Sequence, residues 1–434
     1  MSAPRLVHLG LGNFFRAHTC WHTEHAADAS EWEFAAFTGR SSSPLVGDLN
    51  AQDGRYTLVS RGGDRDRFEV IGSLARAHAA ADHAAWLGYF EDPALAAVTI
   101  TITEAGYVAG AQTRADIAAR RRDPAAVVRT GPSRLVAGLA ARRRVDAGPL
   151  AIVPCDNTPG NGALAQRVMH DIAAQVDEDL AGWIEGSAAI VTTMVDRITP
   201  RTTDTDVARV RDATGFDDRC PVVCEPFHEW VLSGSFPGGR PRWEDAGATF
   251  TEDVTPYEHR KLWLLNGAHS LLAYGASIRG HTTVAEAVGD ETCRSWLHDW
   301  WAVAGPHLDQ PAADVEAYEK ALLERFANAR MHDRLDRIAA DGSQKLPIRI
   351  LPVLCAERAA NRLPAGATRV LAAWICHLRG LGAPVNDARA DEIVPLAQGT
   401  LREAVPRVLG RLDPDLGADA DVVAQVVDQA EQFA

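Results

Sequence analysis

The sequence lacks any apolar run long enough to cross a membrane. Its longest apolar stretches are interrupted by Arg, Asp or His, whereas a spanning helix needs about 20 apolar residues. A surplus of positive charge is also missing, because 44 Lys and Arg stand against 58 Asp and Glu, a formal net charge of −14. This balance argues against a nucleic-acid or anionic-membrane partner, while a local basic site for an anionic ligand stays open. No secretion signal precedes the first strand-like segment, so we expect a cytoplasmic protein.

Paired cysteines are missing as well. The seven Cys are widely spaced, and Cys220-Pro-Val-Val-Cys224 has no second pair. Neither a disulfide framework nor a structural zinc site is expected from this spacing. We therefore predict free thiols and no metal.

The first half of the chain alternates strand-like and helical segments, and the second half reads as helices almost throughout. Alternation of this kind is typical of a mainly parallel sheet covered on both faces. A chain of 434 residues also exceeds one ordinary core. We predict an α/β Rossmann-like N-terminal domain over residues 1–253 and a mainly α-helical C-terminal domain over residues 254–434. Expected strands lie at residues 5–9, 33–38, 56–61, 98–103, 150–154 and 188–195.

A glycine turn follows the first expected strand. The segment Gly10-Leu-Gly12-Asn-Phe-Phe15 leads into a helical stretch, and glycines at this place let the backbone approach a pyrophosphate. Phe15 stands where the third glycine of the dinucleotide fingerprint would lie, so an ordinary strand-to-helix turn is the alternative. The position directly after the first strand favours dinucleotide binding.

The end of the second strand bears on the choice of cofactor. Sites specific for NAD usually place a carboxylate there to bind the ribose 2′-hydroxyl, but this strand runs into Gly39-Arg40-Ser41-Ser42. An arginine beside hydroxyls suits a 2′-phosphate. NAD and NADP both remain candidates, because Arg40 could also stack on the adenine of NAD.

The segment 257–274 is largely apolar after Arg260, and three of its polar residues, Lys261, Asn266 and His269, are spaced along it. On a regular α-helix they fall within an arc of about 140°, so one face can present all three. An amine, an amide and an imidazole together can move a proton to or from an alcohol oxygen and stabilise the charge that develops. The alternative is a buried polar network without chemistry, although the four residues after Lys261 are apolar.

Other polar segments follow expected strands or turns. Asn157 lies in a Pro- and Gly-rich turn after strand 150–154, and Asp196 follows strand 188–195; the carboxyl ends of parallel strands are where α/β sheets bind ligands. Arg337 and Lys345 flank an Asp-Gly turn in the helical half. Tight turns, a structural ion pair and a solvated helix end are the corresponding alternatives.

Together these segments resemble the polyol-specific long-chain dehydrogenase/reductase family, also called the mannitol dehydrogenase family, which includes hexuronate reductases. The resemblance covers most of the chain and runs through residues 8–18, 103–107, 155–162, 194–200, 225–230, 261–269 and 341–345. It implies an oxidoreductase that uses NAD or NADP and acts on a CH–OH group of a small polyol or sugar acid.

The resemblance also implies roles for individual residues. Lys261 would be the general acid/base, Asn157 and Asn266 would flank the reacting oxygen, and His269 would orient the substrate. Substrate-binding residues would be Asp196, Arg337 and Lys345. Cofactor-binding residues would be Gly10, Gly12, Asn13, Phe14, Arg16, Arg40, Thr103 and Glu104.

The first interpretation is the interconversion of a sugar alcohol and its ketose; the alternatives are a hexuronate reductase and, from another class, a non-catalytic sugar-binding protein. The Lys261 amine must then titrate below its reference pKa of about 10.4, which burial beside a bound nicotinamide favours. Lys261 and His269 are separated by about 12 Å of axial rise on a regular helix, so the substrate would be a chain of several carbons. We expect a monomer or weak homo-oligomer, with no nucleic-acid or membrane partner.

Overall fold

A computed structural model describes residues 4–39 and 43–433. The chain divides into two compact units, Met1–Thr255 and Pro256–Ala434. Within the described ranges, no helix combines the length and the apolar character that crossing a membrane requires.

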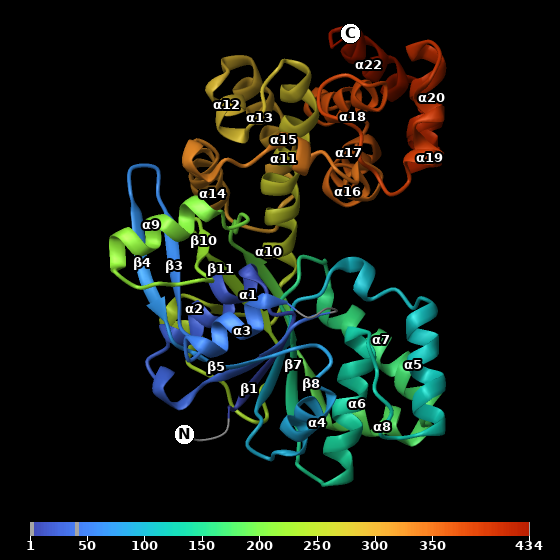
Figure 1. Ribbon diagram of the computed structural model, residues 1–434. Coiled ribbons are helices and arrows are strands. Elements are labelled where there is room, and N and C mark those ends of the chain that lie inside the picture. The colour runs from blue at the N-terminus through green and yellow to red at the C-terminus, as the bar shows by residue number, and fades with distance from the viewer. Residues whose placement is uncertain (1–3, 40–42, 434) are drawn as a thin grey trace. The chain divides into compact units, whose positions relative to one another are not determined.

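The first unit is built on a six-stranded parallel sheet (Figure 1). When its strands are numbered by their order along the chain, they lie across the sheet in the order 3-2-1-4-5-6. This is the strand order of a doubly wound dinucleotide-binding fold. The order reverses between β1 and β6, so the switch point lies at their carboxyl ends. From edge to edge the strands are β5 (Leu74–His78), β2 (Phe34–Phe37), β1 (Leu6–Leu9), β6 (Ala97–Ile100), β7 (Leu150–Pro154) and β8 (Ala188–Ile190).

Both faces of this sheet are covered, which explains why its central strands are mostly apolar; the two polar residues of β1 and β6, His8 and Thr99, lie 2.7 Å apart and form a hydrogen bond. One face packs against helices α4 (His83–Glu91), α6 (Gly131–Arg144) and α7 (Asn161–Val176). The other face carries α1 (Asn13–Ala17) and α2 (Thr19–Glu24) together with the buried Trp230 and Trp243. Helices α3 (Pro44–Ala51), α5 (Ala111–Arg122) and α8 (Glu178–Ser187) complete the layers.

Two small sheets accompany the main one. The first contains β10 (Val222–Cys224), β3 (Tyr56–Arg61) and β4 (Asp66–Ile71), and the second contains β12 (Thr249–Phe250), β11 (Glu229–Ser233) and β9 (Thr192–Asp196). The predicted strand 56–61 therefore forms, but outside the main sheet. The predicted strand 188–195 is divided at Val191 between two sheets.

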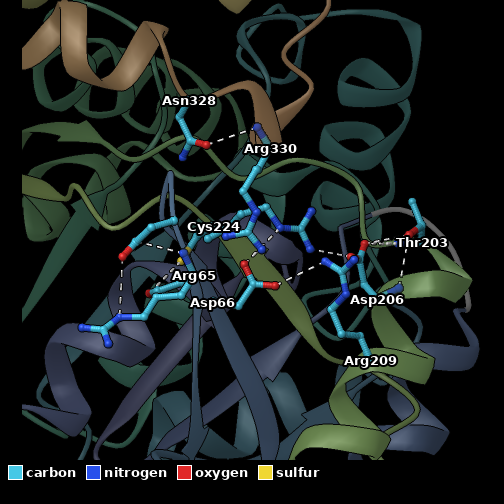
Figure 2. A network of polar contacts seen from close by, with 11 residues as sticks. Arg65, Asp66, Thr203, Asp206, Arg209, Cys224, Asn328 and Arg330 are labelled. Atoms are coloured by element: carbon cyan, nitrogen blue, oxygen red, sulfur yellow. Dashed lines mark hydrogen bonds and ion pairs between the residues drawn. The ribbon is translucent and has the colours of Figure 1, made fainter.

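Helix α9 (Asp204–Thr214) is joined to the β3–β4 hairpin by ion pairs that are buried except for the exposed Arg209 (Figure 2). The Arg61 guanidinium lies 2.5 Å from Asp206 and 3.6 Å from Asp66, and Arg209 lies 3.3 Å from Asp66. Asp206 also closes the capping box with Thr203. Buried charges are retained only when paired, so this network fixes the position of α9.

The second unit is helical, and among its described residues the only β-pairing is an isolated bridge between Thr283 and Arg334. Helix α18 is almost completely buried and packs against α13 and α22. The helical stretch 342–359 is divided at Ile350, whose backbone leaves the helical region just before Pro352. The helices are α10 (Thr255–Arg260), α11 (Gly267–Leu271), α12 (Val284–Gly289), α13 (Glu291–Ala304), α14 (Ala312–Phe326), α15 (Leu335–Ile338), α16 (Gly342–Arg349), α17 (Leu351–Ala359), α18 (Ala365–Leu378), α19 (Ala390–Ile393), α20 (Leu401–Leu412), α21 (Pro414–Ala418) and α22 (Ala420–Glu431). The predicted fold class, a Rossmann-like α/β domain followed by a mainly α-helical one, is confirmed.

Candidate functional site

The glycine turn lies at the switch point of the main sheet. Gly10 has φ +119°, and a Cβ there would collide with the carbonyl oxygen of Thr101. Gly12 is extended, and a Cβ there would meet only the Gly10 carbonyl, at 3.5 Å. Gly10 is therefore required by the fold itself, whereas the space beside Gly12 is left for a ligand. Phe15, in place of the third glycine, is buried and stacks on His8 with the ring centroids 3.6 Å apart.

Arg16 supports this turn from behind. Its guanidinium is buried and donates to the Cys220 carbonyl at 2.5 Å and to Asn13 Oδ1 at 2.8 Å. The Asn13 amide in turn donates to the Pro200 carbonyl at 3.4 Å. Burial lowers the pKa of Arg16 from its ordinary value. The family resemblance assigns Arg16 to the cofactor. In the structure its guanidinium donates to oxygen atoms of the protein and holds Asn13 and the turn in place. Phe14 beside it stacks on His18.

The loops after β6 and β7 are clamped to each other. The Tyr107 hydroxyl donates to Asp156 Oδ2 at 2.6 Å, and both side chains are buried. Burial raises the pKa of Asp156 to about 6, although the hydrogen bond from Tyr107 opposes this rise. The clamp holds the exposed Thr103 and the exposed Asn157 at the same edge of the sheet. Glu104 begins the short 3₁₀ turn Glu104–Gly106 between them.

A second link ties the β7 loop to β9. The Asn161 amide group donates to the Thr193 carbonyl at 2.9 Å and accepts from the Thr193 N–H at 3.0 Å. Asp196, at the end of β9, is buried and opposes Glu229 of β11. Arg197 next to it donates to backbone carbonyls, including that of Glu225 at 3.2 Å, so its role is structural.

A cavity of about 660 Å³ opens at the carboxyl ends of β5 and β6. Small residues line much of it, including Ala80, Ala81, Ala105, Gly106 and Gly131. Its volume is within the range of small-molecule sites, and it lies beside the switch point where doubly wound folds bind dinucleotides. The residues present fit a nucleotide at this edge. Arg40 and Ser41, on which the choice between NAD and NADP was argued, lie outside the described residues.

In the second unit, Lys261, Asn266 and His269 lie on one continuous helical segment, residues 255–278. The expectation of a regular α-helix is wrong, because Lys261–Asn266 forms a π-helical turn, labelled η4 and called the π-turn below. The N–H of Gly267 reaches back five residues to the Leu262 carbonyl. Lys261 and Asn266 are both buried.

The π-turn changes which side chains share a face. Residues five apart differ by about 140° on an α-helix, but in an i→i+5 ring they flank a single turn. Lys261 and Asn266 are five apart, so the π-turn brings them toward the same face. His269 follows three residues later on α11. A second π-helical segment, η5 (Leu272–Ala276), comes after α11.

His269 is near a carboxylate that sequence reasoning missed. His269 Nε2 lies 3.9 Å from Asp333, and the Arg337 guanidinium lies 3.8 Å from the same carboxylate. Burial raises the pKa of Asp333. Lys345 donates to the Ile338 carbonyl at 3.2 Å, and burial lowers its pKa to about 8. The structure therefore groups His269 with Arg337 through Asp333. No spacing in the sequence pointed to Asp333.

Comparison with known proteins identifies the family. Residues 4–245 match the family model of the mannitol dehydrogenase Rossmann domain, and residues 253–434 match that of the mannitol dehydrogenase C-terminal domain. The chain belongs to the mannitol dehydrogenase family. The resemblance predicted from the sequence is thereby confirmed, and this mannitol dehydrogenase family protein is an oxidoreductase.

The chain is similar to several named dehydrogenases and oxidoreductases. D-arabinitol 4-dehydrogenase of Ralstonia nicotianae is 39% identical over 86% of this chain and 82% of that protein. D-mannonate oxidoreductase of Escherichia coli is 34% identical over 80% of this chain and 74% of that protein. The ternary complex of Pseudomonas fluorescens mannitol 2-dehydrogenase with NAD and D-mannitol has a TM-score of 0.86 and 30% identity, covering 100% of this chain and 92% of that one.

Proposed function

We propose that the protein is an NAD(P)-dependent oxidoreductase that interconverts a secondary alcohol of a sugar alcohol and the corresponding ketone. The observation that carries the proposal is the buried Lys261 amine, set on one helical segment with Asn266 and His269. When bound, the nicotinamide supplies the hydride chemistry. The chain itself must move the hydroxyl proton and stabilise the charge on oxygen.

The chain's use of basic residues supports a proton-transfer role for Lys261. The sequence has three lysines, at positions 261, 320 and 345, and 41 arginines. An arginine stays charged in proteins, whereas a buried lysine can release its proton. In a chain that otherwise uses arginine for positive charge, a buried lysine in an apolar segment indicates acid/base chemistry. The neutral amine would accept the hydroxyl proton in oxidation, and the ammonium would return it in reduction.

Asn266 and His269 would act beside the amine without carrying the proton themselves. An amide N–H donates to an oxygen that gains negative charge and needs no change of protonation state. The His269 ring lies against Phe326 and near Asp333, which restricts its orientation. We assign the imidazole to a substrate hydroxyl further along the carbon chain.

The dinucleotide would be held by the first unit. The Gly10–Gly12 turn leaves room for its pyrophosphate, Asn13 is fixed beside the turn by Arg16, and the cavity next to Gly106 suits its adenosine half. On the sequence Gly39-Arg40-Ser41, we propose that NADP(H) is accepted as well as NAD(H). Initial rates with both cofactors test this, and Arg40→Ala should lower the affinity for NADP(H) more than the affinity for NAD(H). A strong preference of the unmodified enzyme for NAD(H) would end the idea.

The charges around the substrate residues favour a neutral polyol over a uronate. The Arg337 guanidinium lies 3.8 Å from the Asp333 carboxylate. Burial lowers the pKa of Lys345 to about 8, and the nearby carboxylates Asp341 and Asp387 only partly oppose this shift. A partly neutralised arginine and a lysine that loses its proton readily leave less positive charge for a substrate carboxylate. The hexuronate reductase alternative retains support from the relationship to D-mannonate oxidoreductase.

The decisive experiment is a substrate panel with both nicotinamides. D-arabinitol, D-mannitol and D-sorbitol should be oxidised with higher kcat/KM than D-mannonate. Lys261→Ala should lower turnover by roughly 10²–10⁴-fold with dinucleotide binding retained, and Lys261→Arg, which keeps the charge but cannot release it, should not restore turnover. Failure to turn over any polyol or uronate while the dinucleotide binds would instead favour a sugar-binding protein.

A further inference from the structure

Two tryptophans that belong to none of the sequence motifs described above donate hydrogen bonds to the π-turn that carries Lys261 and Asn266. Both come from helix α13 and both are buried. The Trp300 indole N–H donates to the Trp263 carbonyl at 2.8 Å, and the Trp301 indole N–H donates to the Leu264 carbonyl at 3.0 Å. The two acceptors are consecutive residues in the middle of the π-turn.

Two neighbouring residues, Gly267 and Arg349, support these hydrogen bonds. A Cβ on Gly267 would lie 2.7 Å from Trp300 Nε1, so the missing side chain lets the indole reach the helix backbone. From the end of helix α16, Arg349 donates to the Asn266 carbonyl at 3.3 Å and to Ser270 Oγ at 3.1 Å. Donors from two other helices thus reach three carbonyls of the π-turn, those of residues 263, 264 and 266.

Side-chain donors matter here because a π-turn is an irregular element. A π-turn holds one more residue than an α-turn. If it relaxed to an α-turn, Lys261 would rotate relative to Asn266 by about 100°. Apolar packing alone does not select one register of backbone hydrogen bonds, because the hydrophobic effect is non-directional. The two indole N–H groups do, because their acceptor carbonyls are specified one by one.

We infer that Trp300 and Trp301 are positioning residues, which hold the π-turn so that the Lys261 amine and the Asn266 amide share one face. This inference rests on the proposed role of Lys261. It assigns to the indole N–H groups an effect on proton transfer that goes beyond filling the core.

The test uses Trp300→Phe and Trp301→Phe, which remove each N–H and keep an aromatic ring. Trp296→Phe is the matched control: Trp296 lies on the same helix and packs against Gly275 and Phe433, and its indole makes no hydrogen bond within the described structure. Misplacing a reacting group by about 1 Å can cost about 10²-fold. We expect kcat for the polyol to fall about 10- to 100-fold in the two test variants, with KM for the dinucleotide unchanged. Trp296→Phe should retain wild-type kcat.

A second readout does not depend on turnover. Selective ¹³Cε-lysine labelling gives three signals, and Lys320→Arg and Lys345→Arg assign them. In the cofactor-free protein, the Lys261 signal and its titration midpoint should move in Trp300→Phe and Trp301→Phe, while the exposed Lys320 signal stays in place. Gly267→Ala, which pushes the indole away, should give the same change.

The outcomes separate this inference from the proposed function. A lower melting temperature with wild-type kcat and an unmoved Lys261 signal would overturn the positioning role and leave the bonds as structural. A wild-type protein that oxidises no polyol would defeat the proposed function, and the lysine spectra would still decide whether the tryptophans position Lys261.

Discussion

Three buried histidines make the stability of the Rossmann-like unit depend on pH. His8, His18 and His22 are each 0% exposed. Burial lowers the pKa of His8 and of His18 to about 3, and lowers that of His22 well below its ordinary value of 6.5. The unfolded chain binds these protons near pH 6.5, whereas the folded chain keeps the rings neutral. Their effect on stability is therefore nil above pH 6.5, and stability is lost as the pH falls below 6.5 toward the folded pKa values.

The magnitude follows from the number of protons. Each neutral histidine costs about 1.4 kcal/mol of unfolding free energy per pH unit below 6.5, so three cost about 4 kcal/mol per unit. Asp156 acts in the opposite direction. Its pKa is raised to about 6, so the folded chain takes up its proton before the unfolded chain does and recovers up to about 1.4 kcal/mol per unit below pH 6. For these four groups together the loss between pH 6 and 5 is about 3 kcal/mol, a large share of a typical 5–15 kcal/mol.

His22→Phe tests this reasoning with little change of shape. Neither ring nitrogen of His22 has a hydrogen-bond partner among the described residues, and the ring lies against His18 and Trp230. Urea unfolding followed by tryptophan fluorescence at pH 7, 6, 5.5 and 5 gives the slope of stability against pH. The variant should lose about 1.4 kcal/mol per pH unit less than the wild type. Equal slopes for the two proteins would refute the argument.

His25→Phe is the control of opposite sign. Its ring lies 2.9 Å from Glu69, which raises the pKa of His25. The stabilisation from this pair is present below pH 6.5 and is lost as the pH rises through the folded pKa. His25→Phe should therefore lack the gain in stability that this pair gives as the pH falls toward 6.5, and below pH 6 its slope should equal that of the wild type.

Three further changes probe the candidate site. Gly12→Val should lower dinucleotide affinity roughly tenfold or more with an unchanged melting temperature, because the fold has room for a Cβ there; a collapsed melting temperature would contradict this. Tyr107→Phe should lower the free energy of unfolding by about 1–3 kcal/mol, because it removes a hydrogen-bond donor from the buried Asp156 carboxylate; thermal unfolding measures this. Titration with the dinucleotide should also show weaker binding. Asp333→Asn should raise the ratio of kcat/KM for D-mannonate to that for the best polyol, because it uncovers the charge of Arg337; an unchanged ratio would count against the charge argument.

Much of the fold could be predicted from local patterns. The alternation of β-branched strands and helices indicated the parallel sheet, and the Gly10–Gly12 turn located its switch point. Strands β4 and β5 were missed, because Asp66–Ile71 mixes charged and apolar residues and Leu74–His78 is rich in alanine. Both are specified by pairing with neighbours, which periodicity along one segment does not report.

The candidate site was predictable only where single residues are unusual for their surroundings. Lys261 stood out as a charge in an apolar run, and Asn157 as an amide after a buried strand. Pairs such as Tyr107 with Asp156 could not be found, since 49 residues separate them and each side chain is ordinary alone. The contact of Arg16 with the Cys220 carbonyl could not be found for the same reason, because 204 residues separate the two.

The π-turn shows most clearly what local periodicity leaves out. Placing Lys261 and Asn266 on a regular α-helix puts them about 140° apart, too far for both to reach one oxygen easily. The irregular turn removes that difficulty, but it leaves its carbonyls in need of specified donors. Within an apolar core, a tryptophan is suited to this task because it combines a large buried ring with one N–H group. The geometry of the proposed acid/base residue thus depends on helix α13, about 40 residues beyond the motif, and substitutions there should alter chemistry before they alter the fold.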